Sequence, residues 1–175
     1  LYSNTIGTNN CAFGYQSMFY NTTGGNNSAF GHGSLINNTT GSNNVAIGYG
    51  ALTTNTIGNN NTIVGLNSLY YNTTGSSNTA VGRSALQSNT TGTSNNAFGY
   101  AALYSNTIGS SNAAFGRVSL YQNIAGLNNS AFGSYSGYDI STGGSNTTVG
   151  YNTGRGITTG NYNTILGANV TGLSA

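Results

Sequence analysis

The side chains that carry acid–base, nucleophilic or metal chemistry are scarce in this chain of 175 residues. His32 is its one histidine, Asp139 its one carboxylate side chain and Cys11 its one cysteine. Catalytic pairs, catalytic triads and three-ligand metal sites each need several such groups close together. We therefore expect no enzyme activity, no metal or cofactor site and no internal disulfide.

Arginine and tyrosine form the one pattern that could bind a ligand. Arg83, Tyr100 and Arg117 follow one another at a constant 17-residue spacing. If each 17-residue stretch is one coil of a stack, their side chains lie about 5 Å apart in successive coils. The tyrosine ring would then lie between two guanidinium groups, either as a surface cation–π ladder or as part of a glycan-binding patch.

The charge of the chain excludes other classes of partner. Charged residues make up 2% of the sequence and the net charge is +2, which is too little to hold a polyanion or to dock on an anionic membrane surface. The sequence also lacks the run of about 18 apolar residues that a membrane-spanning helix needs. We therefore expect neither nucleic-acid binding nor membrane insertion.

Glycine recurs with a 17-residue period along the whole chain. A second, offset series of glycines runs from Gly14 to Gly167 with the same period, and neither series has a gap. Such a repeat is typical of a solenoid, in which each coil packs only on its neighbours. The first series defines position 1 of the repeat and consists of Gly7, Gly24, Gly41, Gly58, Gly75, Gly92, Gly109, Gly126, Gly143 and Gly160.

The repeat has the form G-x-x-N-x-A-[FIV]-G-x-x-[SA]-L-x-x-N-T-[TI]. Its glycines and asparagines disfavour a helix and predict two short strands, one over x-A-[FIV]-G and one over x-[SA]-L-x. The stretch N-T-T-G-x-x-N would close the coil, with glycine and asparagine supplying left-handed backbone at its corners. Stacked asparagine amides can form hydrogen-bond ladders along the axis. The asparagines of position 4 begin with Asn10, Asn27, Asn44 and Asn61.

Positions 6 and 7 of the repeat differ in size and must point to opposite faces of a strand. Position 6 is mostly alanine, so we expect it to face the narrow interior and position 7 to form an apolar stripe outside. Such a stripe favours burial in a symmetric bundle of chains over the alternative, a monomer with the bulky residues inside one wide coil. The predicted stripe contains Phe13, Phe30, Ile47, Val64, Val81, Phe98, Phe115 and Phe132.

The segments Asn44-Val45-Ala46-Ile47-Gly48-Tyr49-Gly50-Ala51 and Asn78-Thr79-Ala80-Val81-Gly82-Arg83-Ser84-Ala85 resemble the head repeat of trimeric autotransporter adhesins of the YadA type. The longer unit found here is also similar to repeats in viral tail fibres and large bacterial surface proteins. The resemblance implies an all-β fold, namely a left-handed parallel β-roll of ten coils, in a homotrimeric fibre at the cell or virion surface. It also implies glycans or host receptors as partners.

The chain begins in the middle of a repeat, so we interpret residues 1–175 as one solenoid segment of a longer fibrous protein. Its expected function is that of a structural or adhesive extracellular fibre, with a viral tail-fibre shaft as one form of it. The alternative is an ice-binding solenoid, since threonine repeats at position 16. That column consists of Thr22, Thr39, Thr56, Thr73, Thr90 and Thr107.

Overall fold

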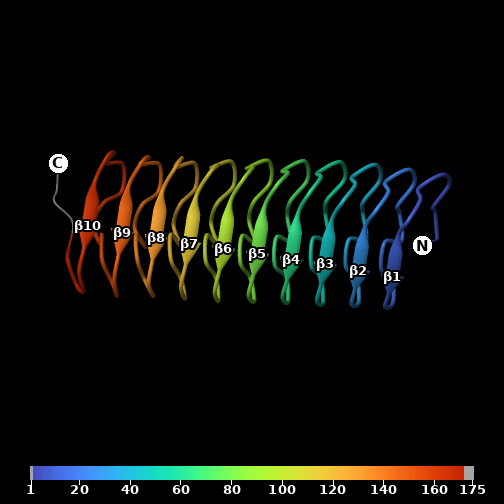
Figure 1. Ribbon diagram of the computed structural model, residues 1–175, viewed down its shortest axis with the longest axis horizontal. Helices are drawn as coiled ribbons and strands as arrows, with labels where there is room; N and C mark the ends of the chain where they lie inside the picture. Colours follow the sequence, from blue (N-terminus) through green and yellow to red (C-terminus); the bar gives the residue numbers. More distant parts are fainter. Residues whose placement is uncertain (1, 172–175) are drawn as a thin grey trace.

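The computed structural model describes residues 2–171, and it is a parallel β-solenoid in which each repeat forms one coil. Each strand spans positions 5 to 7 of its repeat and pairs with the strands of the coils before and after it. Figure 1 shows the coils side by side along the rod, from the N-terminal end to the C-terminal end. The strands are β1 (Cys11–Phe13), β2 (Ser28–Phe30), β3 (Val45–Ile47), β4 (Thr62–Val64), β5 (Thr79–Val81), β6 (Asn96–Phe98), β7 (Ala113–Phe115), β8 (Ser130–Phe132), β9 (Thr147–Val149) and β10 (Thr164–Leu166).

The pairing is in register at the repeat length, so equivalent residues lie above one another. Ala12 pairs with Ala29, and Ala29 with Ala46. Hydrogen bonds between coils continue beyond the strands, as between the N–H of Thr22 and the carbonyl of Thr39 at 3.0 Å. A chain with short strands therefore still satisfies most of its backbone through its neighbours, as a buried backbone requires.

The second strand predicted for each repeat, over x-[SA]-L-x, is wrong. Positions 10 and 12 have left-handed backbone, with φ of 51° at Asn67 and 48° at Leu69, whereas a strand needs φ near −120°. Left-handed backbone costs a leucine about 1–2 kcal/mol. Burying a leucine side chain stabilises the fold by about as much or more, and Leu69 is fully buried. Tertiary packing thus overrides the local preference of the residue.

The prediction that the corner glycines of position 1 and asparagines of position 4 have left-handed backbone is wrong. Gly7, Gly24, Gly41 and Gly58 do not have positive φ, and neither do Asn10, Asn27, Asn44 and Asn61. The left-handed residue at this corner is position 3, where Asn26 has φ of 57°. Glycine is needed at position 1 because a Cβ on Gly41 would lie 2.5 Å from the carbonyl oxygen of Gly58.

The asparagines of position 4 join neighbouring coils through both ends of the amide. The Asn27 Oδ1 accepts the backbone N–H of Asn44 at 2.9 Å, and the Asn27 Nδ2 donates to the carbonyl of Gly41 at 2.9 Å. A second ladder runs through position 15, where the Nδ2 of Asn38 donates to the Oδ1 of Asn21 at 2.7 Å. The predicted asparagine ladders are therefore confirmed, and both are buried.

The core between these ladders is narrow. Position 6 faces inward, as predicted, and Ala29, Ala46 and Ala80 have no exposed surface. The leucines of position 12 are also fully inside, while the bulky residues of position 7 are outside. The structure therefore combines features of the two predicted arrangements. The leucines of position 12 lie inside the coil, as in the wide-coil alternative, whereas the bulky residues of position 7 lie outside, as in the bundle.

Candidate functional site

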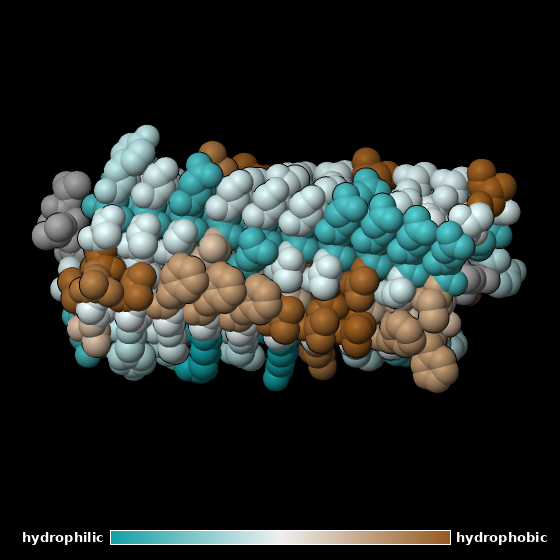
Figure 2. Space-filling view, viewed as in Figure 1, coloured by the Kyte–Doolittle hydropathy of each residue, from teal (hydrophilic) through white to brown (hydrophobic). Residues whose placement is uncertain are grey.

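The bulky residues of position 7 form a continuous column on the strand face, which we call the apolar stripe. It consists of the eight predicted residues followed by Val149 and Leu166, and Figure 2 shows it as a band along the rod. Phe13 is 75% exposed and Phe98, in the middle of the stripe, is 36% exposed. The rings of Phe98, Phe115 and Phe132 stack at centroid distances of 4.8 and 5.0 Å. The predicted outward direction of position 7 is confirmed.

The column at position 9 contains the predicted arginine–tyrosine ladder. The guanidinium carbons of Arg83 and Arg117 each lie 5.8 Å from the ring centroid of Tyr100, and all three side chains are exposed. Arg117 also lies 5.3 Å from the Tyr135 ring and donates a hydrogen bond to the hydroxyl of Tyr135. The stacking predicted from the 17-residue spacing is therefore confirmed.

Position 13 carries a third column of side chains. Tyr104, Tyr121 and Tyr138 stack at 5.1 and 5.2 Å with nearly parallel rings. Partial burial raises the pKa of Tyr121, and the neighbouring tyrosines Tyr104, Tyr138 and Tyr100 raise it further. The ring faces inside this column are covered by one another, so only a ring at the end of the column can offer a face to a ligand.

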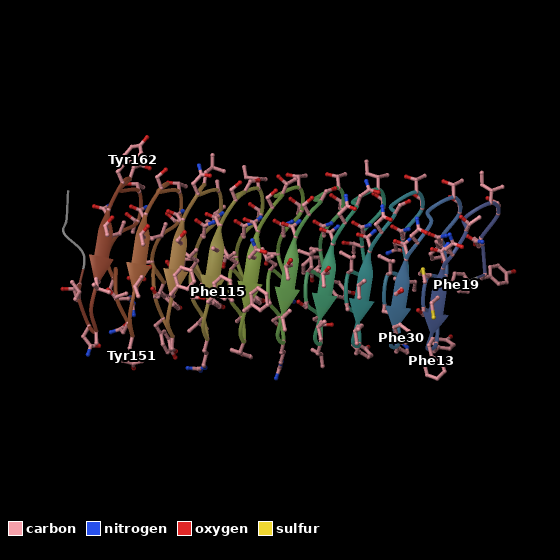
Figure 3. All side chains as sticks on the ribbon, in the orientation of Figure 1. Phe13, Phe19, Phe30, Phe115, Tyr151 and Tyr162 are labelled. Carbon is pink, nitrogen blue, oxygen red and sulfur yellow. The ribbon has the colours of Figure 1, made fainter. Side chains whose placement is uncertain are left out.

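A groove runs along the rod between the columns of positions 9 and 13. Its floor is position 10, which is Gly33, Gly50, Asn67, Ser84 and Ala101 in consecutive coils. Three pockets of about 320, 310 and 140 Å³ lie along it, and none of them is lined by a residue of the apolar stripe. In Figure 3, Tyr151 of position 9 lies at the lower edge of the strand face, below Phe115, and Tyr162 at the upper edge. This groove was not predicted from the sequence.

The pocket of about 320 Å³ lies over coils four to seven. Arg83 and Tyr100 form one wall, Gln87 and Tyr104 the other, and Ser84 is on the floor; Leu66, Asn67, Ala101 and Tyr121 complete the lining. The signal that could have revealed it is the run of small residues at position 10 between two columns of large ones. The groove closes in coil eight, where position 10 is Tyr135, whose ring lies 6.0 Å from that of Tyr138.

One ion pair lies beyond this closed end. The Arg155 Nε donates to the Asp139 Oδ2 at 2.8 Å, and the guanidinium lies over the Tyr138 ring at 4.7 Å. Burial raises the pKa of Asp139, but hydrogen bonds from Arg155 and from the Gly156 N–H outweigh it, so the pKa is lowered overall. The only side-chain carboxylate of the chain is thus already paired.

Residues 2–171 contain neither a cluster of metal-ligating side chains nor a membrane-spanning helix. There is no cluster of three or more histidine, cysteine, aspartate or glutamate side chains that could hold a metal ion. The same residues contain no helix of the length and hydrophobicity needed to cross a membrane. The apolar stripe and the groove are the two candidate binding surfaces described above.

Comparisons with known proteins assign no function. No protein-family model, no curated protein and no solved structure matches the chain. The resemblance seen in the repeat therefore stays a prediction, although the stack of 17-residue coils is established by the structure. The function has to be argued from the two surfaces themselves.

Proposed function

We propose that this chain is a segment of an extracellular fibre, on a cell surface or a virion, in which three copies form a homotrimer of left-handed β-rolls. The apolar stripe is the observation that supports this proposal. It continues through every coil without a polar interruption, and seven of its ten side chains are at least 36% exposed. A monomer rarely leaves so continuous an apolar surface in water.

The shape of the stripe favours three chains over two. The stripe is one side chain wide in each coil, with glycine of position 8 directly after it. Two such ridges placed together leave both flanks in water, whereas three ridges that meet at one axis cover one another. Each Å² of apolar surface removed from water contributes about 25 cal/mol, and equivalent residues meet at every coil because the copies are symmetric.

Such a bundle leaves the groove and the position 9 column outside. These surfaces carry Arg83, Tyr100 and Arg117, which we propose as contacts for surface glycans or host receptors. The fibre would therefore have an apolar inner face for assembly and a polar, aromatic outer face for adhesion. On this proposal the segment has a structural and adhesive role and no catalytic one.

Light scattering coupled to size exclusion tests the assembly. We expect the wild-type chain to elute at three times 17.8 kDa. The triple variant Phe98→Thr, Phe115→Thr, Phe132→Thr removes three stacked rings from the stripe and should shift the protein to monomer. The matched control, Tyr104→Thr, Tyr121→Thr, Tyr138→Thr, removes three stacked rings from the outer face and should stay trimeric.

A wild-type chain that is monomeric at every concentration would overturn the proposal, as would equal dissociation of the two triple variants. A cryo-electron microscopy map of the assembled rods reads the number of chains and the handedness of the coils directly. A dimer or a right-handed coil would contradict those parts of the proposal.

The threonine column gives no comparable support for ice binding. The hydroxyls of Thr22, Thr39 and Thr56 each donate to the backbone carbonyl of the next coil at 3.0 Å. Their hydrogens thus join coils and are not free to organise water. A thermal hysteresis assay tests this alternative, and we expect no activity.

A further inference from the structure

The tyrosine column at position 13 has a gap at Gln87. Tyr70 lies one coil before this residue and Tyr104 one coil after it. Gln87 lines both of the larger pockets, one with Tyr70 and Tyr71 and the other with Tyr104 and Tyr121. The ring of Tyr104 stacks on Tyr121 on its far side, so its near face is directed toward Gln87. The gap therefore opens an aromatic face into the groove.

Polar side chains around this gap have no internal hydrogen-bond partners. Within residues 2–171, the side chains of Arg83, Ser84 and Gln87 make no hydrogen bond, and the Oδ1 of Asn67 is buried without one. By contrast, the asparagines of positions 4 and 15 join neighbouring coils through their side chains. Arg83, Ser84 and Gln87 line the pocket without joining neighbouring coils, so their polar groups are available to a ligand.

The charge beside the gap is positive and uncompensated. Arg83 lines the pocket and Arg117 lies two coils further along the same column. Asp139, the one carboxylate side chain, is paired with Arg155. A guanidinium with free N–H groups binds a carboxylate through two parallel hydrogen bonds, so the pocket favours an anionic ligand.

The remaining features favour a saccharide. The two larger pockets, of about 320 and 310 Å³, share the lining residues Asn67 and Gln87 and so adjoin each other along the rod. Coils recur at about 4.8 Å, close to the interval between sugars in an extended pyranose chain. The amides and the serine hydroxyl can pair with sugar hydroxyls, while the Tyr104 face can pack on a pyranose ring.

We infer that this groove binds an acidic oligosaccharide, with a sugar carboxylate against Arg83 and a neighbouring ring in the gap at Gln87. The inference rests on the proposed adhesive function and names its ligand class. The Ser84 hydroxyl and the Gln87 amide would bind the sugar hydroxyls. Each site would be weak alone, and a trimer would gain affinity by presenting three of them.

Binding is tested by calorimetry with oligogalacturonate, and with a neutral galacto-oligosaccharide of the same length as the uncharged probe. We expect the acidic probe to bind and the neutral one to bind at least about 10-fold more weakly, as the loss of a charged hydrogen bond implies. Arg83→Gln should weaken binding of the acidic probe by the same factor. Gln87→Tyr should abolish binding by closing the gap, and it should fold normally because tyrosine is the residue of neighbouring coils at this position.

Arg155→Gln is the matched control, because it removes the same charge from a residue that lies beyond the closed end of the groove and lines none of its pockets. It should change the affinity by less than about 3-fold. Equal losses in the two arginine variants, equal binding of the two probes, or unchanged binding by Gln87→Tyr would overturn the inference. The mass of each sample is measured in parallel. If the protein is a trimer and binds neither probe, only the glycan site is overturned. If it is a monomer and binds the acidic probe, only the trimer is overturned.

Discussion

The coils up to Asn123 and the two coils after it enclose the same space with different side chains. In the first group position 12 is leucine or methionine and position 15 is asparagine, whereas the later coils have glycine at position 12 and isoleucine at position 15. Gly137 and Gly154 replace the leucines, and Ile140 and Ile157 replace the asparagines, while the length of the repeat is unchanged. The difference shows which features of a coil can be exchanged and which cannot.

At positions 12 and 15, the pair leucine–asparagine and the pair glycine–isoleucine fill a similar volume inside the coil. Leu103 is fully buried with φ of 53°, whereas Gly137 has φ of 61° and is closely surrounded by side chains of its own and neighbouring coils. A Cβ at Gly137 would lie 2.9 Å from the Leu120 Cδ2 and 3.2 Å from the Ile140 Cδ1. Isoleucine at position 15 therefore reaches into the space that leucine at position 12 fills in earlier coils.

The exchange also replaces one kind of stabilisation by another. In earlier coils the Asn106 Nδ2 donates to the Asn89 Oδ1 at 2.7 Å and to the Gly109 carbonyl at 3.0 Å. Ile140 ends this ladder, but glycine at position 12 avoids the cost of left-handed leucine. Both kinds of coil follow the same backbone path. The stacking of coils therefore depends more on that path than on one particular set of core residues.

The largest loss of stability is expected from a side chain that obstructs the backbone of the neighbouring coil. In an earlier coil, a Cβ on Gly75 would lie 2.5 Å from the carbonyl oxygen of Gly92 and would also contact the Asn72 amide, whereas a Cβ on Gly160 would meet nothing closer than 3.1 Å. We expect Gly75→Ala to lower the free energy of unfolding by about 3 kcal/mol and Gly160→Ala by less than about 1 kcal/mol. Urea denaturation followed by circular dichroism measures both. Similar losses in the two variants would show that position 1 needs glycine for another reason.

A double-mutant cycle tests whether positions 12 and 15 are coupled. Leu103→Gly should cost about 3 kcal/mol because it leaves a cavity, and Asn106→Ile about 2 kcal/mol because it leaves ladder partners unpaired. The double variant reproduces the pair found in coil eight and should cost at least about 1 kcal/mol less than the sum. Strict additivity of the two costs would contradict the complementarity, and Gly137→Leu alone should be destabilising.

The smallest effect concerns the ion pair of the later coils. Because the pKa of Asp139 is lowered in the folded chain, its contribution is complete above its ordinary pKa and disappears as the pH falls through the lowered value. Both partners are partly exposed, so we expect a contribution of at most about 1 kcal/mol. Asp139→Asn should be less stable than wild type at pH 6, and the difference should shrink as the pH falls below the ordinary pKa of an aspartate, as measured by urea denaturation. A constant difference across that range would exclude the carboxylate as its cause.

Particular residues show how far the sequence predicts this protein. The inward direction of Ala29 and the outward direction of Phe30 follow from strand alternation, and the Arg83–Tyr100–Arg117 ladder follows from the repeat length. The left-handed backbone at Leu69 could not be predicted, since leucine on its own disfavours it. The groove could not be predicted, because it depends on how the columns of positions 9 and 13 are placed by the turn between them. The sequence does not reveal the backbone of that turn.

The sequence by itself determined the length of the coil, the register of the stack and the residues of the apolar stripe. These follow from the constant 17-residue period and from the alternation of side chains along a strand, which need no knowledge of the rest of the coil. Only the tertiary structure decided why position 1 must be glycine, where the backbone is left-handed, and that isoleucine can replace asparagine beside glycine. Those features depend on contacts between neighbouring coils, where atoms one repeat apart in the sequence compete for the same space.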